Sequence, residues 1–310
     1  MCSRAWRSWL HRRPHARQRQ RRQTSAMRRP VQAKRHAPVC SDACLVGAAR
    51  DEKNIAMTLH RLIGTGPASC ALWQIDLDRP VAAAMVATLS PDERARADRF
   101  AFAHDRDRYI AAHVALRQIL GEQLGVDGGA LGFAAGPFGK PALVGLGAEL
   151  HFNLSHSAGI ALVALSTAGE IGVDVEVPRR LHDAEALAGA HFTEREAEAL
   201  TALPAMERAA AFRVCWTRKE ACLKALGAGF QLDAGSFEVG LAPVAQPVCI
   251  ATAGGPARLM LHSFAVGAGA VGAVALRLPA QARATHPSPE VGAEAKAFAQ
   301  AREAREGLAA

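Results

Sequence analysis

Gly172-Val173-Asp174-Val175-Glu176 is a run in which apolar and acidic residues alternate. Alternation with a period of two predicts a β-strand, because successive side chains of a strand point to opposite faces. Asp174 and Glu176 then share one face, with their Cβ atoms about 6 to 7 Å apart. Taken alone, alternating charge is equally typical of a solvated strand face.

A second run, Trp216-Thr217-Arg218-Lys219-Glu220-Ala221-Cys222-Leu223-Lys224, begins 40 residues after the first one ends. It predicts a helix, in which residues four apart are neighbours. Trp216, Glu220 and Lys224 then form one stripe. By itself, the Glu220 and Lys224 pair is typical of a surface helix, and Trp216 is typical of a core.

The two runs together predict a site, because they bring three carboxylates to one strand and one helix. Asp174, Glu176 and Glu220 supply only oxygen atoms, which suits a hard cation such as Mg²⁺ that also binds phosphate oxygens. Lys224, one turn beyond Glu220, suits a phosphate on that metal. Both runs in one chain favour this interpretation over two unrelated surface features.

Charge is distributed unevenly along the 310 residues. Residues 1–56 hold 14 Lys and Arg against 3 Asp and Glu, a net charge of +11, which leaves −3 for the rest of the +8 chain. A basic nucleic-acid-binding face on the body is therefore not expected. The longest uncharged stretch, 239–257, contains three prolines and does not predict a membrane helix.

The arginine-rich segment 1–56 admits three interpretations. It is an arm that binds RNA or a membrane, a transit peptide, or upstream sequence foreign to the natural protein, which then begins at Met57 or Met27. We favour the third. The seven cysteines form no C-x-x-C pair, which indicates a reducing compartment, so we expect a cytoplasmic protein.

The order of the predicted elements indicates an α+β fold built from two similar halves. We expect an extension over 1–66, an N-terminal half over 67–165, a C-terminal half over 166–280 and a polar tail over 281–310, with the ordered body beginning near Ala68. The predicted strands are 71–77, 151–157, 160–165, 172–176, 237–241, 257–266 and 271–278, and the predicted helices are 91–103, 105–124, 183–203 and 206–226.

Four motifs in this order resemble 4′-phosphopantetheinyl transferases of the Sfp type. They are Phe138-Gly139-Lys140-Pro141, Phe152-Asn153-Leu154-Ser155-His156-Ser157, and the two runs described above. The resemblance covers about residues 70–280. It implies a monomer in which the two halves form a pseudo-dimer, with the active site at their interface.

The resemblance also implies an activity. Such enzymes transfer the 4′-phosphopantetheine arm of coenzyme A to a serine of an apo acyl or peptidyl carrier protein, as a holo-[acyl-carrier-protein] synthase does, and release adenosine 3′,5′-bisphosphate. Mg²⁺ would be held by Asp174, Glu176 and Glu220, and Lys224 would contact the phosphates. Either Glu220 or a metal-bound water would accept the serine proton. The carrier could serve fatty acid, polyketide or non-ribosomal peptide synthesis.

Further residues are implied at the coenzyme A site and the reaction centre. Glu93 stands where some members have a lysine for the 3′-phosphate, so that contact would depend on Arg96. Arg117, on the same predicted helix as Arg108, is as readily explained by a structural ion pair as by a role at the site. Residues carried over from the motifs are His156, Ser155, Lys140 and Arg108 for coenzyme A, and Glu196 near the reaction centre.

One rival is a magnesium-dependent phosphohydrolase that uses the same carboxylates to activate water. The motifs at Phe138 and Phe152 argue against it, because a hydrolase does not need that nucleotide cradle.

Overall fold

The computed structural model describes residues 58–62, 64–67, 69–179, 181, 183–267 and 269–279. The predictions made for segment 1–56, for a start at Met57 or Met27 and for the tail over 281–310 lie outside these residues.

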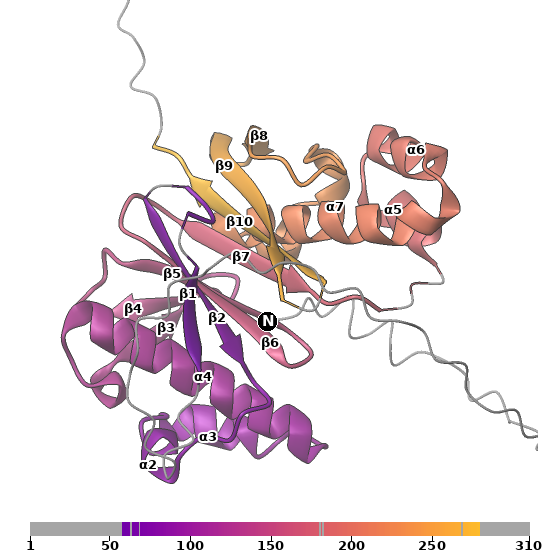
Figure 1. Ribbon diagram of the computed structural model, residues 1–310. Helices are drawn as coiled ribbons and strands as arrows, with labels where there is room; N and C mark the ends of the chain where they lie inside the picture. Colours follow the sequence, from indigo (N-terminus) through magenta and orange to yellow (C-terminus); the bar gives the residue numbers. More distant parts are fainter. Residues whose placement is uncertain are drawn as a thin grey trace, which may run out of the picture.

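Two four-stranded antiparallel sheets form the centre of the molecule (Figure 1). The first has the order β1-β2-β6-β5 and the second the order β7-β10-β9-β8. Their bounds are β1 Leu59–Leu62, β2 Cys70–Asp76, β5 His151–Ser157, β6 Ile160–Ser166, β7 Ile171–Glu176, β8 Gln246–Thr252, β9 Gly255–Val266 and β10 Ala270–Arg277.

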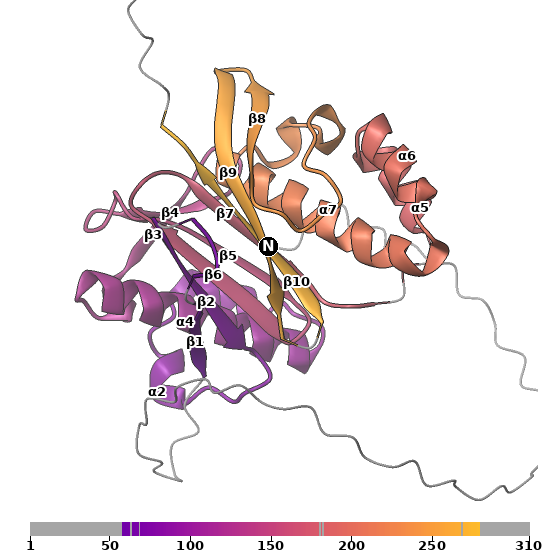
Figure 2. The same ribbon diagram turned by 45° about the horizontal axis from the view of Figure 1, so that its top comes forward.

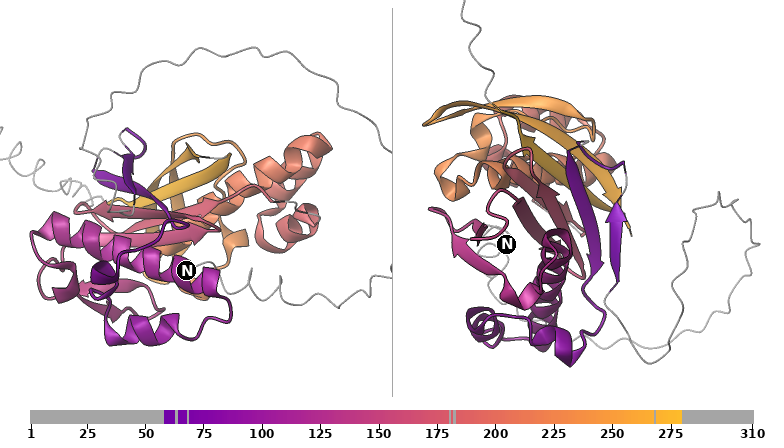
Figure 3. Two further views of the ribbon diagram at one scale, coloured as in Figure 1. Left: turned by 60° about the horizontal axis from the view of Figure 1, so that its bottom comes forward. Right: turned by 90° about the vertical axis from the view of Figure 1, so that its left-hand side faces the viewer.

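Each sheet has its own long helix, α4 for the first and α7 for the second (Figures 2 and 3). A small hairpin, β3 with β4, follows α4. The mixed helices and antiparallel sheets confirm the α+β class. The remaining bounds are α2 Ala83–Val86, α3 Pro91–Ala97, α4 Ala103–Leu124, η1 Gly128–Ala130, β3 Gly132–Ala135, β4 Pro141–Val144, α5 Ala184–His191, α6 Glu194–Ala202, α7 Ala205–Leu226, η2 Gly229–Gln231 and η3 Ala234–Ser236.

Local signals place three helix ends correctly. The Ser90 hydroxyl accepts a hydrogen bond from the Glu93 amide, and the Glu93 side chain accepts one from the Ser90 amide, which is the capping box that the sequence predicts. Helices α4 and α7 end at Gly125 and Gly227, whose φ angles of 69° and 61° are left-handed. Glycine adopts this conformation without a steric penalty.

Three predicted elements are wrong. The helix expected over 183–203 is two helices, because Thr193 caps α6 with its own capping box and so ends α5. Residues 237–241 form no strand. The helix expected over 91–103 stops at Ala97, because α4 starts separately at Ala103.

Four strands were not predicted: β1, β8 and the two strands of the β3–β4 hairpin. β8 contains Pro247, and it is an edge strand, where a missing N–H is tolerated. β1 is only four residues long and carries no clear alternation, yet it pairs with β2. The first described strand therefore lies before Ala68.

The two sheets share a core. One cluster of buried side chains draws Leu72 and Leu162 from the first sheet and Val173 and Val274 from the second. The two halves therefore bury apolar surface against each other.

Candidate functional site

Strand β5 of the first sheet lies beside strand β7 of the second, and polar side chains connect them. Asn153 Oδ1 accepts a hydrogen bond of 2.9 Å from the Val173 amide. Two residues further along β5, Ser155 Oγ donates to Asp174 Oδ1 at 2.8 Å. Alternate residues of β5 thus face β7, and the motif that starts at Phe152 meets the one that starts at Gly172.

Glu176 continues this row of contacts. It accepts hydrogen bonds from Ser157 Oγ at 3.1 Å and from Arg179 Nη2 at 3.0 Å. Asp174 and Glu176 are only 4% and 5% exposed. The two strand carboxylates are therefore buried at the junction, which excludes the solvated-face interpretation.

Lys224 reaches the same junction from helix α7. Its Nζ lies 2.6 Å from Asp174 Oδ1 and donates to Ser155 Oγ at 2.8 Å. Gly172 permits this approach, because a Cβ atom there would lie 2.2 Å from the carbonyl oxygen of Ala221 on α7. The predicted strand and helix motifs do come together.

The protonation of Glu176 and Glu220 depends on their burial and on the charges of Asp174 and Lys224. Burial raises the pKa of Glu176 to about 7, and the charge of Asp174 adds to the shift. Burial and Asp174 likewise raise the pKa of Glu220 to about 7, while Lys224 opposes the shift. Mutual repulsion among these groups is what a bound cation would relieve.

The donor set fits Mg²⁺ in its chemistry. Oδ2 of Asp174 is buried and has no hydrogen-bond partner among the described residues, and all the candidate donors are oxygen atoms. In the described part of the chain, however, no three His, Cys, Asp or Glu side chains are gathered closely enough to form a ready metal site. Because the Lys224 ammonium lies on Asp174 Oδ1, a divalent cation would have to displace it or bind to the other oxygen.

Lys140, expected at the nucleotide, lies at the contact between the halves. Its ammonium contacts the carboxylate of Glu170 and donates to the carbonyl oxygen of Ile171 at 3.0 Å. Burial lowers the pKa of Lys140, and Glu170 opposes that shift. In this arrangement Lys140 connects the β3–β4 hairpin to the start of β7.

His156 and Ser155 are neighbours on β5, so their side chains lie on opposite faces of that strand. Ser155 faces Asp174, while His156 is half-buried on the other face. Ser155 therefore contributes to the β5–β7 junction.

The three arginines considered in the sequence analysis have partners within the first half. Arg108 binds Asp78 through two hydrogen bonds, of 2.6 and 3.2 Å. The guanidinium of Arg96 lies 5.7 Å from the centre of the Tyr109 ring. Arg117 is buried and pairs with Glu93 at 2.8 Å, which supports the structural alternative for Arg117.

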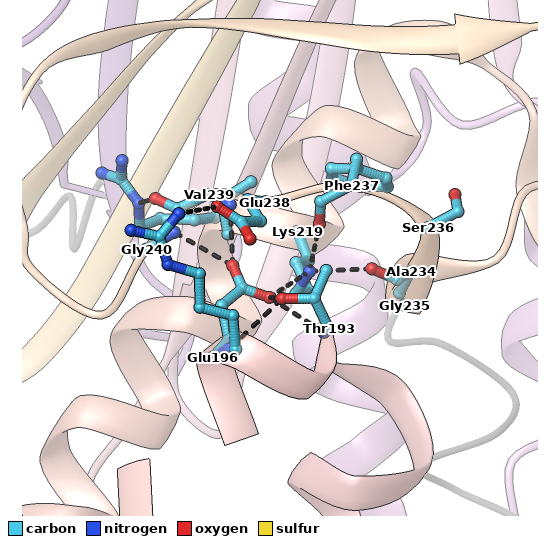
Figure 4. A network of polar contacts seen from close by, with 12 residues as sticks. Thr193, Glu196, Lys219, Ala234, Gly235, Ser236, Phe237, Glu238, Val239 and Gly240 are labelled. Atoms are coloured by element: carbon cyan, nitrogen blue, oxygen red, sulfur yellow. Dashed lines mark hydrogen bonds and ion pairs between the residues drawn. The ribbon is translucent and has the colours of Figure 1, made fainter. Parts of the chain in front are cut away.

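Trp216 and Glu196 belong to the packing of the second half. Trp216 is buried and stacks on Phe212, with ring centres 5.8 Å apart. Glu196, expected near the reaction centre, is buried in an ion pair with Lys219 and accepts hydrogen bonds from the amides of Val239 and Gly240 (Figure 4). Both of its carboxylate oxygens have partners within the chain, and its place near the reaction centre stays a prediction.

Sequence reasoning missed Asn153, Ser157 and Arg179 as neighbours of the acidic pair. Asn153 and Ser157 carried a signal, because the polar residues at positions 153, 155 and 157 alternate on a buried strand. Arg179 follows the strand without a periodic pattern, so only the fold reveals its contact with Glu176.

Comparison with known proteins agrees with this division into two sheets. Residues 76–168 match the family model described as 4′-phosphopantetheinyl transferase, N-terminal, and residues 170–271 match that of the 4′-phosphopantetheinyl transferase superfamily. The chain is 43% identical over 187 residues to the 4′-phosphopantetheinyl transferase HetI of Nostoc, covering 59% of this chain and 78% of HetI. The chain belongs to the 4′-phosphopantetheinyl transferase superfamily.

The chain is also similar to phosphopantetheinyl transferases at lower identity. A 4′-phosphopantetheinyl transferase of Bacillus subtilis is 28% identical over 174 residues, which is 55% of this chain and 76% of that protein. The human L-aminoadipate-semialdehyde dehydrogenase-phosphopantetheinyl transferase is 24% identical over 173 residues, 51% and 55% of the two chains. The two family-model matches of this superfamily member meet between β6 and β7, beside the Asp174 cluster.

Proposed function

We propose that this chain is an Sfp-type transferase that moves the 4′-phosphopantetheine arm of coenzyme A to a serine of an apo acyl or peptidyl carrier protein. The reaction depends on Mg²⁺ and releases adenosine 3′,5′-bisphosphate. The observation that supports the proposal is the contact of half-buried Lys224 with the buried carboxylate of Asp174, beside Glu176, at the β5–β7 junction. Superfamily membership supplies the reaction class.

The proposed reaction exchanges one phosphorus–oxygen bond for another. The serine oxygen bonds to the phosphorus that carries the pantetheine arm, the bond from this phosphorus to the adenosine bisphosphate breaks, and the serine proton passes to a base at the site. Such transfers rely mainly on positioning and on neutralising phosphoryl charge. Asp174, Glu176 and Glu220 would hold Mg²⁺, which neutralises charge on the pyrophosphate oxygens.

Lys224 is proposed to exchange partners when substrate binds. Its ammonium lies on Asp174 Oδ1, at the acidic cluster that would hold the metal. A pyrophosphate bound at this cluster would offer stronger anionic partners. Lys224 would then orient the pyrophosphate while staying within reach of Ser155.

We propose the coenzyme A contacts from the positions of the motif residues in the fold. His156 on β5 and Arg108 and Arg96 in the first half are the proposed phosphate and nucleotide contacts. Ser155 acts through Asp174 and Lys224, and Lys140 would have to leave Glu170 to reach the nucleotide.

The proposed setting is a cytoplasmic monomer that needs no nucleic acid. Among the described residues, none of the helices combines the length and the apolar character required to cross a membrane.

Intact-protein mass spectrometry of an apo carrier protein tests the function. With the full chain, coenzyme A and Mg²⁺, the carrier should gain the mass of one phosphopantetheine arm. The gain should disappear with EDTA or with Asp174→Asn and persist with Asp107→Asn, a carboxylate that is 62% exposed on α4. Comparison with residues 57–310 tests whether segment 1–56 is dispensable.

Two results would contradict the proposal. Cleavage of coenzyme A without any gain by several carriers would favour the phosphohydrolase. A gain that survives both EDTA and Asp174→Asn would remove the metal and Asp174 from the reaction.

A further inference from the structure

Helices α6 and α7 are joined by a buried ion pair. Lys219 Nζ lies 2.7 Å from Glu196 Oε2, and the two residues are 1% and 4% exposed (Figure 4). Lys219 directly precedes Glu220 in the chain. A buried ion pair is costly unless further hydrogen bonds satisfy both groups, so the surroundings of this pair carry information about its role.

Lys219 also binds the segment that follows helix α7. Its Nζ donates to the carbonyl oxygens of Ala234 at 2.7 Å and Phe237 at 2.6 Å. It lies 4.8 Å from the centre of the Phe237 ring. An ammonium group has three donors, and the two carbonyls and Glu196 account for all three.

Glu196 binds the same segment from the other side. Its Oε1 accepts hydrogen bonds from the amides of Val239 at 2.7 Å and Gly240 at 3.0 Å. Its Oε2 accepts from the Thr193 amide at 3.1 Å in the capping box of α6. Burial raises the pKa of Glu196, but hydrogen bonds from Lys219 and Val239 outweigh burial and lower the pKa overall. Glu196 is therefore an anion at neutral pH.

Arg218 extends the attachment along α7. It is fully buried, and it donates to the carbonyl oxygens of Val239 at 2.7 Å and Val244 at 2.8 Å. Two consecutive residues of α7 thus hold the segment 234–244, and Glu220 is the next residue of the same helix. Lateral movement or rotation of α7 would break these contacts.

We propose that Glu196 and Lys219 are a positioning pair, which holds helix α7 in the orientation that presents Glu220 and Lys224 to Asp174. Neither side chain contacts a reactant. This role deepens the proposed function, and it rests on that function wherever transfer to a carrier is the quantity measured. It replaces a role for Glu196 at the reaction centre with a role in the geometry of the metal ligands.

Four variants separate positioning from direct action. Glu196→Gln and Lys219→Met each leave one buried charge without its partner, whereas the double variant leaves none. Glu198→Gln on the exposed side of α6 is the control. Thermal unfolding, the Mg²⁺ concentration for half-maximal transfer, kcat and direct Mn²⁺ binding are measured for each.

Under the proposal, each single variant lowers the Tm and raises the half-maximal Mg²⁺ concentration about tenfold or more, as loss of a supporting contact does at metal sites. Transfer at saturating Mg²⁺ falls much less. The double variant regains most of both losses, so that the two substitutions are strongly non-additive. Glu198→Gln behaves as wild type.

A different result overturns the proposal. Suppose that Glu196→Gln and the double variant lose the same large share of transfer at saturating Mg²⁺, while the half-maximal Mg²⁺ concentration of each stays that of wild type. Glu196 then acts on the reactants. If wild type transfers nothing to any carrier, the proposed function fails. The pair is then judged by Mn²⁺ binding and Tm, and additive losses or unchanged Mn²⁺ affinity refute positioning.

Discussion

Protonation of single carboxylates links the site to the stability of the protein. The pKa values of Glu176 and Glu220 are both raised to about 7. Without metal, the folded state therefore holds protons that the unfolded state releases at lower pH. The resulting stabilisation is complete below the ordinary glutamate pKa of 4.5 and is lost as pH rises through about 7.

We therefore expect the metal-free protein to lose stability, on the order of 2 kcal/mol, between about pH 5 and about pH 8. Mg²⁺ should restore part of the loss at the higher pH, because it binds the deprotonated carboxylates. Thermal unfolding with and without Mg²⁺ measures both effects. Glu220→Gln should flatten the pH dependence, and an unchanged slope in that variant would contradict the assignment.

Ser155 supports the site through one hydroxyl group, which contacts both Asp174 Oδ1 and Lys224 Nζ. We expect Ser155→Ala to weaken Mg²⁺ affinity about 10- to 100-fold, because the carboxylate loses a partner that orients it. Ser166→Ala is the control, since that buried hydroxyl accepts a bond from the Ala168 amide instead. Calorimetric titration with Mg²⁺ distinguishes the two, and equal affinities would count against this role for Ser155.

At the scale of elements, the contact between β7 and α7 sets the geometry of the site. A Cβ atom at Gly172 would lie 2.2 Å from both the Ala221 oxygen and the Ala225 nitrogen. These are backbone atoms of α7, so the helix itself must shift. The glycine is needed for close approach and not for backbone conformation.

We expect Gly172→Ala to cost about 1 to 3 kcal/mol of stability through overpacking. It should also reduce transfer, because Lys224 would be displaced from Asp174. Gly189→Ala on α5 is a matched control, because nothing lies within 4 Å of its added Cβ. That change should be neutral or stabilising. Urea unfolding and the transfer assay measure both variants; a fully stable and active Gly172→Ala would refute the packing argument.

At the scale of the whole molecule, the shared core indicates that the two halves unfold together. Leu72 and Leu162 pack in one buried cluster with Val173 and Val274 of the other sheet. Neither sheet would keep this apolar surface covered alone, and exposing it is costly. A single cooperative transition is the expected behaviour.

Tryptophan positions make this testable. In residues 57–310, Trp73 reports on the first half and Trp216 on the second. Urea unfolding of Trp73→Phe and of Trp216→Phe, each followed by fluorescence, should show transitions of equal width, each coincident with the loss of circular dichroism in the same variant. Fluorescence midpoints that separate from the circular dichroism midpoint would mean that the halves unfold independently.

Local patterns in the sequence were sufficient for much of this protein. The alternation at Gly172–Glu176 predicted the strand, the spacing from Trp216 to Lys224 predicted the helix, and Ser90, Gly125 and Gly227 marked helix ends. These features depend on residues that are close in the chain, where backbone geometry and side-chain period govern the outcome. The α+β class followed from them, and the resemblance of four motifs indicated the superfamily.

Only the tertiary structure decided which side chains meet. Lys140 forms an ion pair with Glu170, and Glu196 forms one with Lys219. The motif resemblance had implied that Lys140 and Glu196 lie near the reactants. β8 formed despite Pro247 because it occupies a sheet edge. Such contacts join residues far apart in the chain, and the packing of two sheets and two long helices selects them. No local period encodes that packing, so the sequence by itself determined the candidate groups and the fold determined their partners.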